Sequence, residues 1–286
     1  NPSIVPSLYR IASKESNKKD EILSRCIDLI KTSSDNQEQK YLLYRQAMGL
    51  KPSVKIQNKL LNALGNTKSL QALMFVGKYL SKNETSSAAA NAVKNLIAKN
   101  SNALRIISAK QQLEQAKTVF QAQKEKGSAD AGYAVDEISG LMPKFKSDGY
   151  RQIIKNVEGT KVPVELMKQT GNFEMFVDWR VKDGTAALNY GGVTLAELSK
   201  NSVIISGMTS KQATKKPTIR PNWNTLYLKV ANGRLTLISN GETLAENYGI
   251  DNLSGATLGS TIEFQTRQGT VYVRDAYVYE HPATPE

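Results

Sequence analysis

The sequence is poor in two residue types on which many active sites depend. Its 286 residues include one cysteine, Cys26, and one histidine, His281. A single cysteine cannot form a disulfide within the chain, and its position in a helical pattern indicates a buried thiol. A single histidine near the end of the sequence excludes a zinc site with several histidines, and equally a Ser-His-Asp triad or a Cys-His dyad in a stable interior. Any catalysis must therefore depend on carboxylates, arginine, lysine or tyrosine.

Long apolar runs are also missing. Hydrophobic residues make up 40% of the chain, but no run approaches the roughly 18 to 20 apolar residues that a membrane-spanning helix needs. We therefore expect no membrane span. The sequence has no signal-peptide pattern and starts at Asn1 rather than at a methionine. This start suggests a mature form from which a targeting segment has been removed.

What the sequence does contain is two different patterns that meet near its middle. Residues 1–130 carry 21 lysines and arginines against 10 acidic residues, a net charge of +11, whereas residues 131–286 carry 17 against 16, a net charge of +1. The first pattern has almost no glycine and is typical of successive helices. The second has short alternating strands with glycine and asparagine turns. The sequence therefore predicts two domains, each long enough to bury a core of its own.

The helical part shows apolar side chains at helical spacing, one stripe per segment. The predicted helical segments are 20–30, 39–48, 53–64, 67–80, 86–99 and 102–125. No such helix can bury its stripe alone, but antiparallel pairs stacked side by side can. The rhythm of residues 20–100 resembles HEAT-type helical repeats. We therefore expect an α-helical HEAT-like repeat domain over residues 1–126, and the loop-like sequence that follows predicts a linker over residues 127–140.

The basic charge of the helical part has two interpretations. It can be a solvated lysine-rich face, or it can bind a protein or a polyanion partner. Lysine outnumbers arginine, the lysines are evenly spread, and no aromatic stacking residues lie among them. These three features disfavour nucleic acid as the partner.

The second part predicts an antiparallel β-sandwich over residues 141–286. Its clearest strand covers residues 173–181, where apolar and polar side chains alternate. The apolar face of this strand consists of Phe173, Met175, Val177, Trp179 and Val181. Asn232-Gly233 and Asn240-Gly241 predict hairpins, and Asp183-Gly184 and Gln268-Gly269 predict further turns.

Four segments of this part carry a recognisable pattern, in which a Trp-Asn precedes a strand, an Asn-Gly hairpin follows, and Gln and Arg flank a glycine turn. The segments are 171–180, 216–225, 232–241 and 262–274. Together they resemble the 3-keto-disaccharide hydrolase domain family, a concanavalin- or laminin-G-like jelly roll. The resemblance implies sugar handling, including hydrolysis of 3-keto-glycosides. It also implies a periplasmic or secreted protein, since the family is common in such proteins of Bacteroidetes-type bacteria.

The chain departs from the family where substrate-facing polar residues are expected. Residues 184–192 lack the arginine that usually ends the segment after the first strand. The family's acidic-x-Gln strand and the Asp after it have their nearest counterpart in residues 197–201, which lack both the Gln and the Asp. The missing residues favour a protein that binds sugar without hydrolysing it.

Glycoside hydrolysis usually needs two carboxylates across the scissile bond, about 5 to 10 Å apart. Asp178 matches a carboxylate position of the family and Glu197 does so more loosely, so these two are the predicted acid/base pair. Tyr190, beside two glycines, is the predicted exposed aromatic residue. The predicted substrate-binding residues are Arg180, Tyr190, Glu263, Gln265 and Arg267.

Other residues are assigned structural roles. Arg274 is expected to form an ion pair with a neighbouring carboxylate, and Trp223 is expected to pack as an anchor before its strand. Asp251 and Asn252 offer two oxygen donors, far fewer than the roughly six to eight that calcium takes. We therefore predict no metal site and no cofactor.

Two functions of different classes stay open. In the first, which the missing polar residues favour, a degenerate sandwich binds carbohydrate or acts as a scaffold beside the helical repeats. In the alternative, the chain is an active glycoside hydrolase that acts on 3-keto-glycosides with Asp178 and Glu197.

Overall fold

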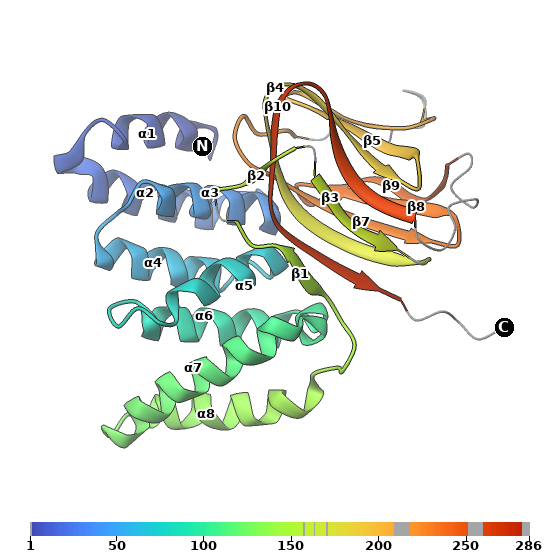
Figure 1. The fold of residues 1–286 in the computed structure, drawn as a ribbon. Helices are drawn as coiled ribbons and strands as arrows, with labels where there is room; N and C mark the ends of the chain where they lie inside the picture. Colours follow the sequence, from blue (N-terminus) through green and yellow to red (C-terminus); the bar gives the residue numbers. More distant parts are fainter. Residues whose placement is uncertain are drawn as a thin grey trace. The chain divides into compact units, whose positions relative to one another are not determined.

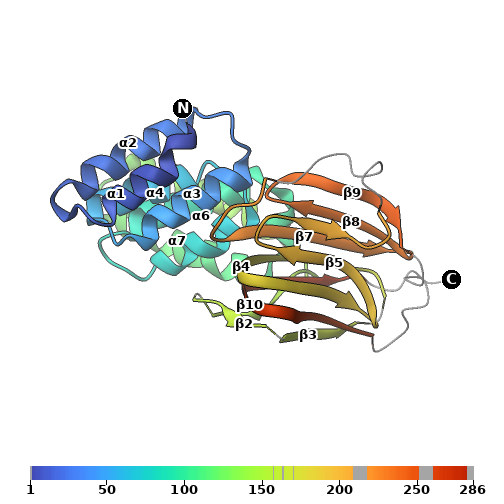
Figure 2. The ribbon, with the colours of Figure 1, turned by 90° about the horizontal axis from the view of Figure 1, so that it is seen from above.

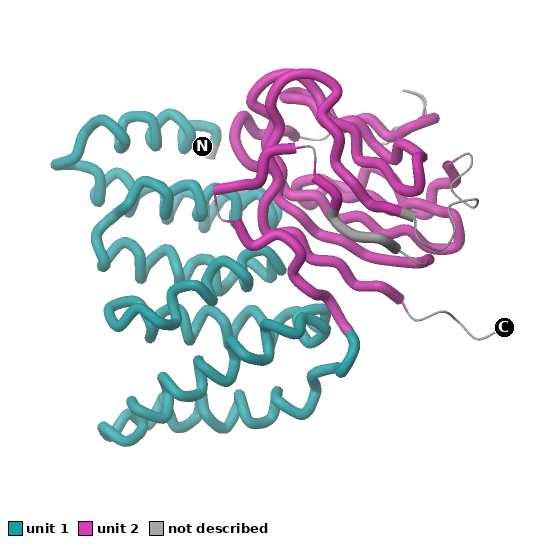
Figure 3. Tube along the Cα trace, viewed as in Figure 1, with its two compact units in different colours: residues 1–148 teal, residues 149–286 magenta. Residues whose placement is uncertain are grey.

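The computed structural model describes residues 2–156, 158–162, 164–169, 171–208, 218–250 and 260–281. It divides into two compact units, Asn1–Asp148 and Gly149–Glu286, which are coloured separately in Figure 3. Asp251 and Asn252, considered above as calcium donors, lie outside the described residues, as do two residues of the family-like segment 216–225.

The first unit is helical throughout its described residues. Its α-helices are α1 (Val5–Ala12), α2 (Lys19–Thr32), α3 (Gln37–Gly49), α4 (Val54–Leu64), α5 (Leu70–Val76), α6 (Ser86–Lys99), α7 (Ile107–Glu125) and α8 (Ala129–Leu141). Short 3-10 helices cover Pro2–Ile4, Ser16–Lys18, Gly77–Tyr79, Ser101–Arg105 and Met142–Lys144.

The helices of this unit pack as successive pairs (Figure 1). The first helix of each pair contacts the second, and α2, α4 and α6 also contact one another in turn. Each helix buries its apolar stripe in this way, as Leu23 and Ile27 do on α2 and Leu60 and Leu61 do on α4. Cys26 is fully buried, as predicted, and burial raises the pKa of its thiol to about 11.

The prediction of a linker over residues 127–140 was wrong, because most of that stretch forms α8. Ser128 caps this helix through its side chain, which accepts a hydrogen bond from the backbone N–H of Ala131. The buried side chains of the helix are Ala131, Ala134, Val135 and Ile138. This spacing makes one apolar stripe against α7. The packing outweighs the glycines that made the stretch look like a loop.

The second unit is built from strands. They are β1 (Arg151–Ile154), β2 (Thr160–Lys161), β3 (Val164–Gln169), β4 (Phe173–Tyr190), β5 (Val193–Ser199), β6 (Val203–Ile205), β7 (Asn224–Ala231), β8 (Arg234–Ser239), β9 (Glu242–Gly249) and β10 (Ser260–Glu280). All their pairings are antiparallel.

Two long strands, β4 and β10, pair along their whole length and hold the unit together (Figure 1). The first half of β4 pairs with β7, and from there the sheet continues through β8 to β9, in the order that Figure 2 shows. The second half of β4 pairs instead with β5, and β5 pairs with β6. On its other side β10 pairs with β3 near its start and with β2 and β1 further along. The sheet therefore has two halves that share one central ladder.

The two halves meet at a bend that the sequence presented as turns. Gly184 and Gly269 are paired across the β4–β10 ladder, with φ values of +74° and +76°. A Cβ on Gly184 would lie 1.9 Å from the backbone oxygen of Gln268. The expected turns at Asp183-Gly184 and Gln268-Gly269 are therefore bends inside two continuous strands. Only glycine combines this backbone conformation with so close an approach.

One apolar core lies between the two halves of the sheet, so the prediction of an antiparallel β-sandwich is confirmed. Trp179 and Met175 enter this core from the first half of β4, and Leu188 enters it from the second half. The five apolar residues predicted for residues 173–181 all belong to the core cluster. Among the described residues, no helix combines the length and the apolar character that crossing a membrane requires.

Candidate functional site

The candidate site is the outer face of the half-sheet formed by β3, β10, β4, β5 and β6. Ile262 and Phe264 point into the core, so Glu263 and Gln265 alternate to the outside of β10. Glu263 is paired with Asn189 on β4, and Gln265 with Ala187. We call the outward polar residues of this half-sheet the polar face. They are Glu165, Asn189, Thr194, Glu197, Glu263, Gln265 and Arg267.

The register of the strands brings these residues together in two rows. Glu165 on β3 lies opposite Glu263, and on the far side of β4 Asn189 lies opposite Thr194. In the second row, Glu197 on β5 lies opposite Ala187, whose small side chain leaves room between its neighbours. Four of the seven predicted site residues therefore share one face.

Hydrogen bonds connect the polar face across its strands. Arg267 Nη2 donates to Thr194 Oγ1 at 3.2 Å, and Thr194 Oγ1 donates to Asn189 Oδ1 at 2.9 Å. Arg267 Nε also lies 3.5 Å from Glu197 Oε1. On β10, Gln265 Nε2 donates to Glu263 Oε1 at 2.6 Å. These contacts orient the arginine and both amides; Arg267 and Gln265 are exposed, whereas Asn189 is only 7% exposed.

The ion pair of the polar face lies open to solvent. The side chains of Arg267 and Glu197 are 53% and 46% exposed. An exposed pair of this kind contributes about 1 kcal/mol or less to stability. Its charges are therefore available to a ligand at little cost to the fold.

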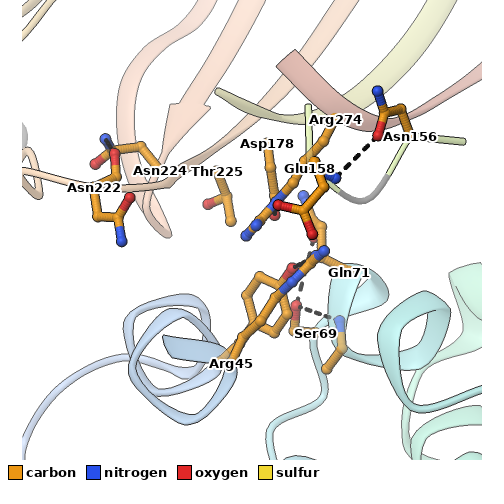
Figure 4. Close-up of polar contacts among 12 residues, drawn as sticks. Arg45, Ser69, Gln71, Asn156, Glu158, Asp178, Asn222, Asn224, Thr225 and Arg274 are labelled. Carbon is orange, nitrogen blue, oxygen red and sulfur yellow. Dashed lines mark hydrogen bonds and ion pairs between the residues drawn. The ribbon is translucent and has the colours of Figure 1, made fainter. Parts of the chain in front are cut away.

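Asp178, the other predicted catalytic carboxylate, lies elsewhere. Its side chain is fully buried, and Arg274 Nε donates to its Oδ2 at 3.1 Å (Figure 4). The expected ion pair of Arg274 is thereby confirmed. Asp178 belongs to the first half of β4 and lies opposite Thr225 on β7, whereas Glu197 extends from β5 on the other half-sheet. The core lies between the two outer faces, so the structure does not bring Asp178 and Glu197 together as an acid/base pair.

Arg180 is also outside the polar face. Its guanidinium lies over the rings of Trp223 and Tyr272, at 4.9 and 5.0 Å from their centroids. Arg274 lies 3.9 Å from the centroid of Trp223. These cation–π contacts place Arg180 in a packed stack of cations and rings on the first half-sheet. A Cβ on Gly159 would lie 2.6 Å from Trp223, so the ring is held as the anchor that the sequence predicted.

The expectation that Tyr190 is an exposed aromatic was wrong. Its side chain is 2% exposed, and its ring lies 5.1 Å from that of Phe173. Its hydroxyl donates to the backbone oxygen of Gly171 at 3.2 Å, and burial raises the pKa of the phenol. Tyr190 lies opposite Ile262 in the strand register, so it points into the core, and the glycines beside it do not change that direction.

The Trp-Asn signature of the family-like pattern has a structural explanation. Asn224, which is 1% exposed, accepts a hydrogen bond from the backbone N–H of Arg220 at 2.7 Å. Its Oδ1 also accepts one from Asn240 Nδ2 at 2.7 Å, and Asn240 in turn accepts from the backbone N–H of Thr225. Figure 4 shows Asn224 and Thr225 at the start of β7. Asn224 and Asn240 together hold the entry to β7.

Sequence reasoning missed two groups. Glu165 carried no signal, because no strand had been assigned around it. Glu174 lies on the polar side of the alternating segment 173–181, and alternation alone does not reveal that Tyr150 and Tyr227 donate to its Oε2 at 2.5 and 2.8 Å. His281 Nε2 and Lys229 Nζ lie 2.9 and 3.6 Å from its Oε1.

This environment determines the charge of Glu174. Burial alone would raise the pKa of the carboxyl. The two tyrosine hydrogen bonds and the charges of Lys229 and His281 outweigh burial, so the pKa of Glu174 is lowered from 4.5. Burial and the charge of Glu174 raise the pKa of Tyr227. Within the described residues, no group of three or more His, Cys, Asp or Glu side chains is arranged to hold a metal ion.

Neither a family model nor a curated protein matches the chain. The structure of a protein named as a glycosyl hydrolase from Parabacteroides distasonis is 16% identical, covers 43% of this chain and 75% of its own, and has a TM-score of 0.33. The galectin LEC-6 of Caenorhabditis elegans is 14% identical, covers 45% of this chain and 96% of its own, and has a TM-score of 0.29. The exoplasmic/lumenal domain of VIP36 is 15% identical, covers 50% of this chain and 82% of its own, and has a TM-score of 0.26. None of these values places the chain in a family.

Proposed function

We propose that the second unit binds carbohydrate through the polar face and does not hydrolyse it. The observation that carries this proposal is the gathering of two amides, three carboxylates and an arginine on one face of a half-sheet. The resemblance of four segments to the 3-keto-disaccharide hydrolase domain supports the ligand class. We further propose that the helical unit is a HEAT-type repeat array and that the protein is periplasmic or secreted.

The chemistry of the polar face suits a sugar. A sugar hydroxyl donates one hydrogen bond and accepts others, and amides, carboxylates and guanidinium groups match both roles. Arg267 can donate to two neighbouring hydroxyls at once because its donors form a planar fork. The contact of Arg267 with Thr194 at 3.2 Å orients this fork before a ligand arrives. Such orientation lowers the entropy lost on binding.

The position of Asp178 supports binding without hydrolysis. A carboxylate with a fully buried side chain that is paired with Arg274 cannot transfer a proton to a ligand on the polar face. One observation favours the alternative, a glycoside hydrolase. Glu165 and Glu263 lie opposite each other on adjacent strands, where Cβ atoms are about 4.5 to 5.5 Å apart. Retaining glycosidases hold their two carboxyl groups about 5 to 5.5 Å apart.

Calorimetric titration of the full chain with 3-keto-glucosides and plain disaccharides, followed by product analysis, tests the proposal. We expect saturable binding without product, and a loss of affinity of about tenfold or more in Arg267→Met. Arg234→Met is the matched control, because Arg234 is an exposed arginine on β8 whose Nε donates to the backbone oxygen of Asn247 at 2.8 Å. Equal binding by Arg267→Met and the unaltered chain would overturn the assignment of the polar face. Product formation that disappears in Glu263→Gln would establish the hydrolase instead.

A further inference from the structure

The helical unit contains a cleft that the sandwich proposal does not use. It has a volume of about 320 Å³ and is lined mostly by residues of α2, α3 and α4. Small-molecule sites commonly enclose about 300 to 1,000 Å³, so the cleft has room for a ligand of monosaccharide size. A bare inorganic anion would not fill it.

The walls of this cleft carry an excess of positive charge. Lys31, Lys40 and Lys59 line it against one carboxylate, Asp28, which gives a formal net charge of +2. Asp28 is already paired with Lys59, whose Nζ lies 2.9 Å from its Oδ1 and donates to Ser24 Oγ at 2.9 Å. The negative charge of Asp28 is therefore paired within the wall of the cleft.

The positive charges of the other two lysines, Lys31 and Lys40, are not paired with a carboxylate of the described residues. Lys40 Nζ donates to the backbone oxygen of Lys31 at 3.1 Å, which is a neutral acceptor. Lys31 is exposed, and across the described ranges neither lysine forms an ion pair with a carboxylate. Two ammonium groups on one cleft wall match a dianion, and a phosphate monoester carries a charge of about −1.5 to −2 at neutral pH.

The hydroxyl of a largely buried tyrosine reaches the same cleft. Tyr44 is 2% exposed and lines the cleft, and within the described part of the chain its hydroxyl has no hydrogen-bond partner. Burial and the charge of Asp28 raise the pKa of this phenol to about 12, so it stays protonated and can donate. A bound acceptor oxygen would give this donor a partner inside the cleft.

The remaining lining of the cleft suits a sugar ring. Gln37, Asn62 and Asn66 supply amide groups, and Ile27 and Ala63 supply apolar surface. Amides bind hydroxyls, and a small apolar floor covers the C–H face of a ring. Gln37 is also the first residue of α3, where the positive end of the helix dipole favours an anion.

We propose that this cleft binds a phosphorylated monosaccharide. Lys31 and Lys40 hold the phosphate, Tyr44 donates to one of its oxygens, and the amides bind the sugar hydroxyls. This site is independent of the polar face of the second unit, so either proposal can fail alone. A carboxylated sugar offers the same type of charge at half the magnitude, and the test separates the two.

Calorimetric titration of the full chain at low salt with glucose 6-phosphate, glucuronate, glucose and inorganic phosphate tests the proposal. We expect saturable binding of glucose 6-phosphate, weaker binding of inorganic phosphate and of glucuronate, and a steep loss of affinity at high salt. Lys31→Met and Lys40→Met should each weaken the binding of glucose 6-phosphate about tenfold. Lys110→Met on α7, an exposed lysine outside the cleft, is the matched control.

Three outcomes would overturn the proposal. The first is no saturable binding of glucose 6-phosphate, and the second is equal weakening by Lys110→Met and Lys40→Met. The third is a competitor that binds as tightly as glucose 6-phosphate. Inorganic phosphate with that affinity would show that the cleft does not recognise the sugar, and glucuronate with that affinity would show that it does not require a phosphate. Lys31 is exposed, so Lys31→Met keeps the test valid if a variant at the half-buried Lys40 fails to fold.

Discussion

We expect Asp178→Asn to destabilise the second unit strongly. The exposed fractions of the Arg274 and Asp178 side chains are 9% and 0%, and the two groups are 3.1 Å apart. The substitution keeps the shape of the side chain but removes the negative charge that faces the buried guanidinium at this contact. Breaking a buried pair in this way typically costs about 3 to 5 kcal/mol. For a unit of this size that corresponds to a fall in Tm of about 10 to 15 °C.

Tryptophan fluorescence provides an assay confined to this unit. The chain has two tryptophans, Trp179 and Trp223, and both belong to the second unit. Thermal unfolding followed by their emission therefore reports the sandwich and not the helices. The control is Glu197→Gln, which removes the carboxylate of an exposed pair at 3.5 Å from Arg267. We expect the control to change the stability by about 1 kcal/mol or less.

Equal Tm values for Asp178→Asn and the unaltered chain would refute this reasoning. Such a result would mean that the charge of Asp178 does not stabilise the fold. The carboxylate would then have to be reconsidered as a functional group. A large loss in the Glu197→Gln control would equally contradict the contrast between the buried and the exposed pair.

Two further predictions concern the same unit. Gly184→Ala should lower the free energy of unfolding by at least about 1 to 2 kcal/mol because of its left-handed backbone, and by more because its Cβ would meet the backbone of Gln268. The control is Gly249→Ala, where a Cβ meets nothing within 4 Å and the change in stability should be close to zero. Urea denaturation measures both variants, and equal losses of stability would contradict the bend. Because the pKa of Glu174 is lowered from 4.5, its contribution is present above that pH and disappears as the pH falls through the folded-state value. The Tm difference between the unaltered chain and Glu174→Gln should therefore be large at neutral pH and shrink in acid, and a constant difference would exclude the charge as its cause.

The sequence predicted the regular elements well where one local period dominates. The alternation over residues 173–181 identified the core face of β4, and helical stripes identified α2, α4 and α6. The linker prediction failed because the glycines of residues 127–140 were given more weight than the helical spacing of the buried side chains of α8. The predicted turns at Gly184 and Gly269 failed because a glycine in a bend and a glycine in a turn look alike in sequence.

The candidate site was predicted in part, for a different reason. Alternation within β10 placed Glu263 and Gln265 on one face, and Glu197 joined them through strand pairing. Alternation could not separate the two half-sheets of the sandwich, so Asp178 was assigned to the same site although it faces outward from the other half. Tyr190 was misplaced because the strand continues past the bend and keeps its alternation.

The shared β4–β10 ladder has a consequence for how the protein is made. Phe173 pairs with Glu280, and Tyr190 pairs with Ile262, so the central ladder joins parts of the chain that leave the ribosome far apart in time. The helical unit depends on contacts between neighbouring helices and can fold while synthesis continues. The apolar face of β4 stays uncovered until β10 has emerged, and exposed apolar strands of this kind aggregate. The sandwich is therefore the part of this chain that is more exposed to aggregation until synthesis ends.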